Sequence, residues 1–338
     1  MRPFEYLRAD SAQAAVAAAG AAGAEGATLA ATQFIAGGTT LLDLMKLDVM
    51  RPKRLIDLNA LEAEYHQIRV DAQGLWLGAL VRMSAAAGHP RIVQDYPVLA
   101  QSLQLAASAQ LRNMASLAGN VLQRTRCNYF RDPSYAECNK RSPGSGCAAI
   151  LGRNRKLAVL GVSEHCIAHY PGDLAQALVA LEASVELLGR HGRRSLLLQE
   201  LHRPPGDTPH VETALGSDEL IVGFRVPARA WVRRSLFLKI RDRSSFEFAL
   251  ASAAVALDLA QDVVRQARIA LGGVATRPWR AHEAEALLEG QPFDEAQARA
   301  AAEAAFASAV THGDNDFKPE LGRRTLVRAL LECAALPI

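Results

Sequence analysis

The sequence contains few aromatic residues and no long apolar run, and both absences narrow the class of protein. Aromatic residues make up 6% of the 338 positions. A helix that spans a membrane needs about 20 consecutive apolar residues, and no stretch approaches that length, so we expect no transmembrane helix. The net charge of +3 arises from 38 basic and 35 acidic residues, a balance too even to indicate a nucleic-acid partner.

Cysteine is also scarce, and its placement is uneven. The chain has five cysteines, an odd number in a sequence too long to need disulfides for its stability. Three of them fall within RTRCNYFRDPSYAECNKRSPGSGC, residues 124–147, a basic segment that has neither helical nor strand periodicity. Metal binding or simple burial is therefore favoured over a disulfide framework.

Half of the residues are hydrophobic, which is enough for a sizeable core divided into two or three lobes. Apolar runs bounded by glycine and proline predict strands, and Ala-rich and Leu-rich segments with 3.6-residue spacing predict helices. The fold class expected from this mixture is α+β, with a boundary near Pro227 and most of the later helices towards the C-terminus. Strands are expected, among other places, at 34–36, 54–58, 156–161 and 235–240, and a hairpin is expected from 68–70 and 75–79. An Ala-rich helix capped by Asp10 or Ser11 is expected through about residue 19, where Gly20 ends it.

The segment FIAGGTTLLDLMK, residues 34–46, reads as a strand, a Gly-Gly turn and a helix. Such a turn exposes backbone N–H groups that can bind an anion, and Gly37 and Gly38 allow close approach of a pyrophosphate. Thr39 and Thr40 add hydroxyl groups. The pattern fits neither a dinucleotide-binding GxGxxG nor a P-loop, and a purely structural turn remains the alternative.

A second turn of small residues, SLAGN at residues 116–120, offers similar chemistry. Two such turns support a phosphate site better than one does, although tight packing alone would also explain small residues here. Lys239 lies within the apolar run LFLKI. A lone lysine there either extends to solvent or places a cation against a ligand.

Four cysteines are separated by 10, 8 and 18 residues, and none forms a CxxC pair; they are Cys127, Cys138, Cys147 and Cys166. This spacing fits neither a zinc ribbon nor a ferredoxin run. An iron-sulfur cluster, structural zinc, reactive thiols and unrelated buried cysteines all remain open from the spacing. Cys333, in the apolar helical pattern LVRALLECAAL, is expected to be a small core residue.

Taken together, these segments resemble the FAD-binding subunits of the molybdenum hydroxylases, the xanthine dehydrogenase family, along essentially the whole chain. FIAGGTTLLDLMK is similar to the first pyrophosphate loop of that family, and LRNMASLAGNV to the second, with Ala118 where the family usually has glycine. PGDLAQALVALEA and ARIALGGVATRPWRAHEAE resemble two later segments. The resemblance implies subdomains at 1–60 and 61–227 and a C-terminal α+β domain at 228–338.

The cysteine segment narrows the resemblance, because most relatives join the second turn to Asp173 by a short link. Here an insertion of about residues 121–170 lies between them. Its sequence resembles that of the flavin subunits of bacterial periplasmic aldehyde oxidoreductases, in which four cysteines hold a 4Fe-4S cluster. This implies Cys127, Cys138, Cys147 and Cys166 as cluster ligands and leaves Cys333 out.

The resemblance also implies the FAD contacts, residue by residue. The acidic contact is Asp173, which can also cap its helix, the apolar contact is Ile221, and the basic contact is Lys239. The contacts in the two loops are Gln33, Phe34, Ile35, Ala36, Gly37, Gly38, Thr39, Thr40, Leu41, Ser116, Gly119 and Asn120.

The function implied is that of the FAD and 4Fe-4S electron-transfer subunit of a heterotrimeric molybdenum-dependent aldehyde oxidoreductase. Its expected partners are a small 2Fe-2S subunit, a large molybdenum-cofactor subunit and an external electron acceptor, without nucleic acid or a membrane span. A 4-hydroxybenzoyl-CoA reductase-like complex and a zinc-binding structural subunit without flavin are the alternatives. No signal peptide is expected, so the compartment is the periplasm after co-export with a partner, or the cytoplasm.

Overall fold

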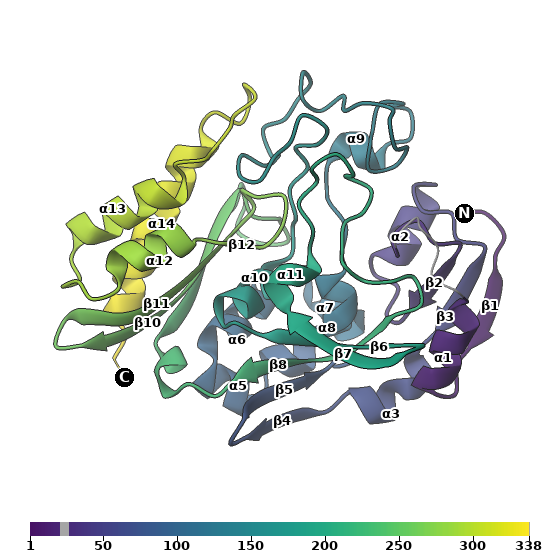
Figure 1. The fold of residues 1–338 in the computed structure, drawn as a ribbon, viewed down its shortest axis with the longest axis horizontal. Coiled ribbons are helices and arrows are strands. Elements are labelled where there is room, and N and C mark those ends of the chain that lie inside the picture. The colour runs from purple at the N-terminus through teal and green to yellow at the C-terminus, as the bar shows by residue number, and fades with distance from the viewer. Residues whose placement is uncertain (21–26, 338) are drawn as a thin grey trace.

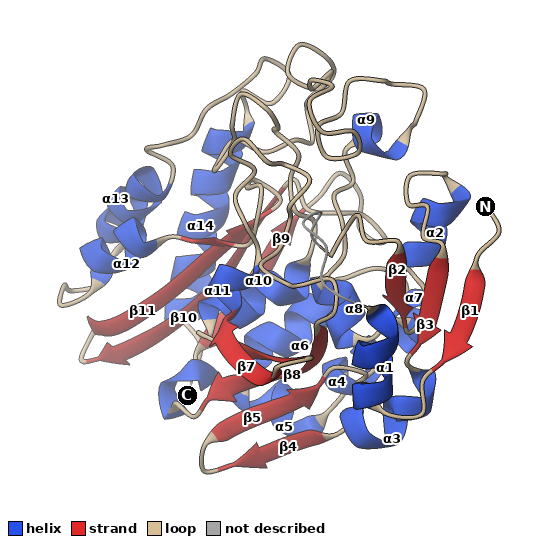
Figure 2. Cartoon of the chain, turned by 45° about the vertical axis from the view of Figure 1, so that its right-hand side comes forward, coloured by secondary structure: helices blue, strands red, loops and turns tan. Residues whose placement is uncertain are grey.

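The computed structural model describes residues 1–20 and 27–337 and contains three sheets with helices packed around them (Figures 1 and 2). Their strand orders are β1-β3-β2, β4-β5-β8-β6-β7 and β12-β11-β10-β9. The predicted α+β class is confirmed.

The N-terminal lobe is a small parallel sheet. Its strands are β1 (Glu5–Arg8), β2 (Thr32–Ile35) and β3 (Arg54–Asp57), with β3 in the middle. Ser11 caps α1 (Ala12–Ala19) by accepting a hydrogen bond from the N–H of Ala14, and Gly20 ends that helix, as the sequence predicts. The short helix α2 (Leu41–Lys46) follows β2, and η1 (Asn59–Leu61) and α3 (Glu62–Tyr65) lead out of the lobe.

The central lobe is an antiparallel five-stranded sheet covered by short helices. The hairpin of β4 (Ile68–Asp71) and β5 (Gly74–Gly78) was predicted, whereas the strand β7 was not. The other strands are β6 (Ser184–Gly189), β7 (Gly192–Leu197) and β8 (Leu220–Pro227). The helices are α4 (Met83–Ala87), α5 (Pro90–Asp95), α6 (Pro97–Gln104), α7 (Ala109–Met114), α8 (Leu117–Val121), α10 (Asp173–Ala180) and α11 (Leu198–Leu201). The fully buried helix α10 packs between this lobe and the next.

In the C-terminal lobe, α12 and α14 pack on one antiparallel sheet, and α13 packs on these two helices (Figure 1). After η2 (Ala230–Arg233), its strands are β9 (Ser235–Ile240), β10 (Ala251–Ala260), β11 (Val263–Gly272) and β12 (Trp279–Arg280). Its helices are α12 (His282–Leu288), α13 (Glu295–Ala305) and α14 (Lys318–Ala334). Cys333 is fully buried in the core of this lobe, as expected.

The cysteine insertion, residues 121–170, forms the irregular upper part of Figure 1, and α9 (Asn128–Arg131) is its helix among the described residues. The strand predicted at 156–161 is wrong. Leu157 to Leu160 are buried, but the backbone there bonds to Ile167 on one side and Val274 on the other, and no continuous ladder forms. The apolar character of this stretch reflects burial between two segments rather than membership of a sheet.

Candidate functional site

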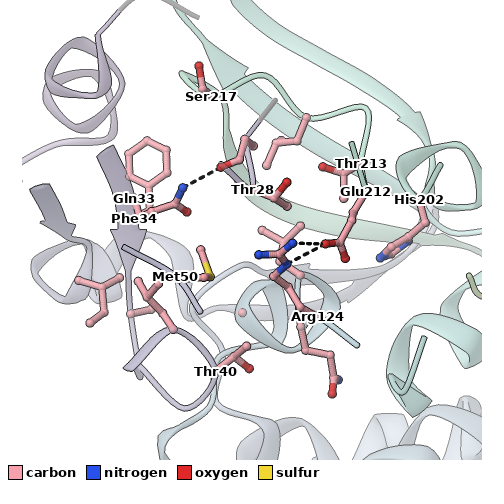
Figure 3. A pocket seen from close by; sticks show the side chains of 18 of the residues that line it. Thr28, Gln33, Phe34, Thr40, Met50, Arg124, His202, Glu212, Thr213 and Ser217 are labelled. Carbon is pink, nitrogen blue, oxygen red and sulfur yellow. Dashed lines mark hydrogen bonds and ion pairs between the residues drawn. The ribbon is translucent and has the colours of Figure 1, made fainter. Parts of the chain in front are cut away.

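A cavity lies between the N-terminal and central lobes and reaches the base of the cysteine insertion (Figure 3). One wall contains every residue of the predicted first loop, Gln33 to Leu41, together with Thr28 and Met50. Ser116 and Gly119 of the second loop line it as well. The opposite wall comes partly from the cysteine insertion and partly from the segment 202–219, which the sequence did not suggest; it includes Gln123, Arg124, Lys140, Tyr170, His202, Arg203, Glu212, Thr213, Leu215, Gly216, Ser217 and Glu219.

Glycine is required at the two positions of the Gly-Gly turn for different reasons. Gly38 has φ +71°, a left-handed conformation that side chains other than glycine rarely adopt. Gly37 lies so close to the end of α7 that an added Cβ would overlap the carbonyl oxygen of Met114. The first loop is therefore packed directly on the second, and Gly37 is required for this packing as well as being available for close approach of a pyrophosphate.

The second loop is a short helical turn rather than an irregular reversal. Ser116 is the N-cap of α8, and its Oγ accepts a hydrogen bond from the N–H of Gly119 at 3.2 Å. Asn120 does not line the cavity, but its Oδ1 is buried and has no hydrogen-bond partner among the described residues. Of the three residues of this loop that were expected to contact FAD, Ser116 and Gly119 therefore line the cavity and Asn120 does not.

Asp173 and Lys239 form a buried ion pair with each other. The Lys239 Nζ lies 2.7 Å from Asp173 Oδ2, and the two side chains are 1% and 5% exposed. Burial raises the pKa of the Asp173 carboxyl, while the charge of Lys239 opposes that rise. Neither residue lines the cavity, and Ile221 lies in the core of β8. Their roles as FAD contacts stay predictions.

A second buried ion pair, absent from the sequence-based expectations, closes the far side of the cavity. The Arg124 guanidinium donates to Glu212 Oε1 from Nε at 2.7 Å and from Nη2 at 2.5 Å. Lys140 lies 3.6 Å from the same carboxylate and donates to the carbonyl of Pro209 at 3.0 Å. These cations hold the pKa of Glu212 below its ordinary value despite burial. Lys140 and Arg124 lie 72 and 88 positions from Glu212 in the sequence. No local sequence pattern therefore indicates this ion-pair group.

The rings of Tyr170 and His202 pack against each other beside this group in a tilted arrangement, with centroids 4.6 Å apart and an interplanar angle of 58°. Both bond the carbonyl of Val121, from the Tyr170 hydroxyl at 2.7 Å and His202 Nε2 at 3.0 Å. A carbonyl only accepts, so Nε2 carries the hydrogen and the buried Nδ1 is unprotonated. Burial lowers the pKa of His202 to about 4, which keeps the ring neutral at pH 7.

The structure brings the four cysteines of the insertion together. Cys127, Cys138 and Cys166 share one small hydrophobic core with Phe130, and Cys147 packs against it. Cys138 and Cys147 pair across a single backbone bridge. The charge of each thiolate would raise the pKa of a neighbouring thiol, which is a consequence of their proximity.

The free thiols of Cys127 and Cys166 are protonated at neutral pH. Burial raises the pKa of Cys127 to about 12 and of Cys166 to about 11. Backbone N–H groups oppose that rise; the N–H of Ala168 lies 3.5 Å from Cys166 Sγ. Within residues 1–20 and 27–337, no three His, Cys, Asp or Glu side chains are close enough to share one metal ion.

Two consecutive segments of the chain match two known domain families. Residues 2–229 match the FAD binding domain in molybdopterin dehydrogenase, and residues 237–334 match the CO dehydrogenase flavoprotein C-terminal domain. The chain belongs to the FAD-binding subunits of the molybdenum hydroxylase family. Membership confirms the resemblance inferred from the sequence and makes the chain part of an oxidoreductase.

Individual relatives of this FAD-binding subunit extend over nearly its whole length. It is 48% identical to the aldehyde oxidoreductase FAD-binding subunit PaoB of Escherichia coli K12, over 90% of this chain and 92% of that protein. It is 28% identical to the carbon monoxide dehydrogenase medium chain of Hydrogenophaga pseudoflava, over 88% of each. A solved structure of the latter enzyme superposes with a TM-score of 0.74 at 27% identity, covering 99% of both chains.

The cavity fits FAD in three respects. The glycine turn and Ser116 bring backbone N–H and hydroxyl groups to one end, where a pyrophosphate can bind. Thr39 and Thr40 of the first loop add further hydroxyl groups to the lining. Phe34, Ile35 and Leu215 supply apolar contact area for ring systems. These residues would hold FAD in the FAD-binding subunit.

Proposed function

We propose that the chain is the FAD and 4Fe-4S electron-transfer subunit of a heterotrimeric molybdenum-dependent aldehyde oxidoreductase. The convergence of four cysteines in one buried core next to the flavin cavity carries this proposal. The aldehyde substrate is proposed because the 48% identical relative is named an aldehyde oxidoreductase subunit. When bound, FAD supplies the exchange between two-electron and one-electron steps towards an external acceptor.

The chain itself contributes binding, orientation and charge. The turn at Gly37 and Gly38 presents backbone to the pyrophosphate end of the cavity, and Ser116 fixes the second turn against it. The Arg124–Glu212 pair and the neutral His202 form a polar wall with little access to water. No acid or base step is assigned to these residues, because the aldehyde is oxidised in another subunit of the proposed complex.

The cysteine core supports a 4Fe-4S cluster over structural zinc. The four cysteines lack the CxxC pairs that are typical of structural zinc sites. The resemblance of the insertion to flavin subunits of aldehyde oxidoreductases, the class in which the 48% identical relative is named, favours a 4Fe-4S cluster. N–H groups that point at sulfur stabilise the charge of such a cluster.

The proposed partners are a small 2Fe-2S subunit and a large molybdenum-cofactor subunit. Relatives of this chain are named as medium chains and subunits of larger enzymes, which supports a multi-subunit complex. No described helix is long and apolar enough to cross a membrane. We propose the periplasm as the compartment, reached by co-export with a partner; fractionation of cells that express all subunits tests this.

Absorbance spectroscopy with metal analysis tests the cofactor content. The purified complex should show flavin bands and a broad iron-sulfur absorbance that dithionite bleaches. After subtraction of the iron in the 2Fe-2S subunit, about four irons should remain for this chain. A colourless protein with one zinc per chain would contradict the proposal.

The substrate class is tested on the complete complex. Aryl aldehydes should reduce the enzyme and be converted to carboxylic acids. Turnover of aryl-CoA thioesters with a reductant, and none of aldehydes, would instead identify a 4-hydroxybenzoyl-CoA reductase-like complex with the same cofactors in this chain.

A further inference from the structure

The cysteine insertion contacts both walls of the flavin cavity, at positions far apart in the sequence. On one side it meets α2, which follows directly from the glycine turn of the first loop. On the other side it meets the segment 203–213, which lines the opposite wall. The insertion therefore spans the two parts of the chain between which FAD must fit.

The contact with α2 combines charge and burial. Asp43 of α2 pairs with Arg131 at 2.9 Å and with Arg126 at 3.3 Å, both in the insertion. On the inner face of α2, Leu44 is 1% exposed and packs in the same core as Cys127 and Cys138. Met50, which follows α2, both packs against this core and lines the cavity. A displacement of the cysteine core would thus move the helix that follows the glycine turn.

The contact with the opposite wall is a buried network. Lys140, two positions after Cys138, pairs with Glu212 at 3.6 Å and bonds the carbonyl of Pro209 at 3.0 Å. Arg124, at the start of the insertion, completes the group through its two bonds to Glu212. Further out, the Ser163 hydroxyl donates to the carbonyl of Gly206 at 2.9 Å. If the insertion unfolded, Glu212 would become a buried charge without Arg124 and Lys140 as partners.

We propose that the cysteine insertion is a clamp on the flavin cavity, with Asp43 and Glu212 as the positioning residues through which it holds the two walls together. Retention of FAD then depends on the folded insertion. The inference rests on the proposed function in one respect: a 4Fe-4S cluster is taken as the group that keeps the insertion folded. The contacts themselves are those of the protein chain.

The first test is Asp43→Asn in the assembled complex, with the dissociation rate of FAD measured by the rise of free-flavin fluorescence after dilution. Exposed ion pairs contribute modestly, so the rate should increase about two- to tenfold while the iron content stays unchanged. Asp43→Glu should restore the slower rate, and excess FAD should restore full flavin occupancy of Asp43→Asn. An unchanged rate in Asp43→Asn would overturn the role of Asp43.

Arg155→Gln is the matched control. Arg155 also joins the insertion to another part of the chain, through two bonds to Asp242 at 2.9 and 3.0 Å, but neither residue lines the cavity. The FAD dissociation rate of the Arg155→Gln variant should equal that of the wild type. A rate increased as much as in Asp43→Asn would show a general loosening of the insertion rather than a clamp.

The second test removes the cluster by anaerobic chelation from the intact complex. FAD dissociation should accelerate more than in Asp43→Asn, because both contacts are lost together. Unchanged FAD retention by a complex shown to have lost the iron of this chain would overturn the clamp but leave the proposed cluster intact. Absence of that iron from the wild-type complex would overturn the proposed cluster, and the Asp43 variants would still test the clamp.

Discussion

The flavin cavity is lined mainly by loops that leave the ends of strands and helices, whereas the cysteine insertion beside it contains one four-residue helix, α9, among the residues described. Beside the cavity, the ladder of β2 with β3 and the cap of α8 by Ser116 satisfy backbone groups. In the insertion, turns joined by local backbone hydrogen bonds are held together by long side chains as well: Arg141 donates to the carbonyls of Tyr129 and Phe130 at 2.7 and 2.9 Å.

Lys318 is a second long side chain that bonds backbone carbonyls of the insertion, and it comes from the C-terminal lobe. Its side chain is fully buried, and its Nζ donates to the carbonyls of Lys156 and Leu157 at 3.1 and 2.9 Å and of Gly273 at 2.6 Å. Burial lowers the pKa of this ammonium group to about 7. A segment without regular structure is thus fixed in place by side chains from within it, such as Arg141, and from distant parts of the chain, such as Lys318.

The largest effect is expected from Cys138→Ser, which removes one proposed ligand from the insertion. Nearly all of the iron of this chain should be lost, because an incomplete set of thiolates holds a 4Fe-4S cluster poorly. Iron analysis and the dithionite-sensitive absorbance measure this. Cys333→Ser, in the separate core of the C-terminal lobe, should keep its iron; equal iron in both variants would contradict the ligand assignment.

The next largest effect is expected from Lys239→Met, which breaks the buried ion pair of two predicted FAD contacts. It leaves Asp173 as a buried carboxylate without a partner, which should lower the free energy of unfolding by about 3 to 5 kcal/mol. Thermal unfolding of the FAD-loaded protein measures the change. The double variant with Asp173→Asn should recover part of the stability, since no buried charge remains; no recovery would show that the two residues act separately.

Gly37→Ala should affect the cavity without affecting the insertion. The added Cβ would overlap the Met114 carbonyl, and overpacking of this kind costs about 1 to 3 kcal/mol, so the affinity for FAD should fall about tenfold or more. FAD titration measures this, and the iron content should not change. Gly88→Ala is the control, because a Cβ there meets only ordinary contacts. Full FAD affinity in Gly37→Ala would contradict the packing of the two loops.

The smallest effect concerns pH and His202. Its pKa is about 4 in the folded protein and 6.5 in its ordinary state, so the unfolded chain binds more protons between those values. The stability contributed by neutral His202 is complete above pH 6.5 and is lost as the pH falls towards 4, by about 1 kcal/mol at pH 5.5. Thermal unfolding from pH 7.5 to 5.5 should therefore show a smaller decrease for His202→Gln; an equal decrease would assign the pH dependence elsewhere.

Sequence reasoning succeeded where a local pattern has a local cause. The turn at Gly37 and Gly38, the capped helix after Ser11 and the helices of the C-terminal lobe follow from spacing and from residue type. The stretch at 156–161 failed because an apolar run reports burial, and burial between Ile167 and Val274 leaves the same pattern as a strand. Lys239 was expected to reach solvent or a ligand, and its burial opposite Asp173 is a third outcome that depends on packing.

The amino-acid sequence by itself determined the family, the α+β class, the first flavin loop and the set of cysteines in the insertion, because each depends on residues that are neighbours along the chain. Only the tertiary structure decided that Asp173 pairs with Lys239, that Glu212 joins Arg124 and Lys140, and that Asp43 connects α2 to the insertion. Each of these contacts joins residues 66 to 88 positions apart. Charges at such separations meet only when packing brings their segments together, and one-dimensional spacing carries no record of that packing.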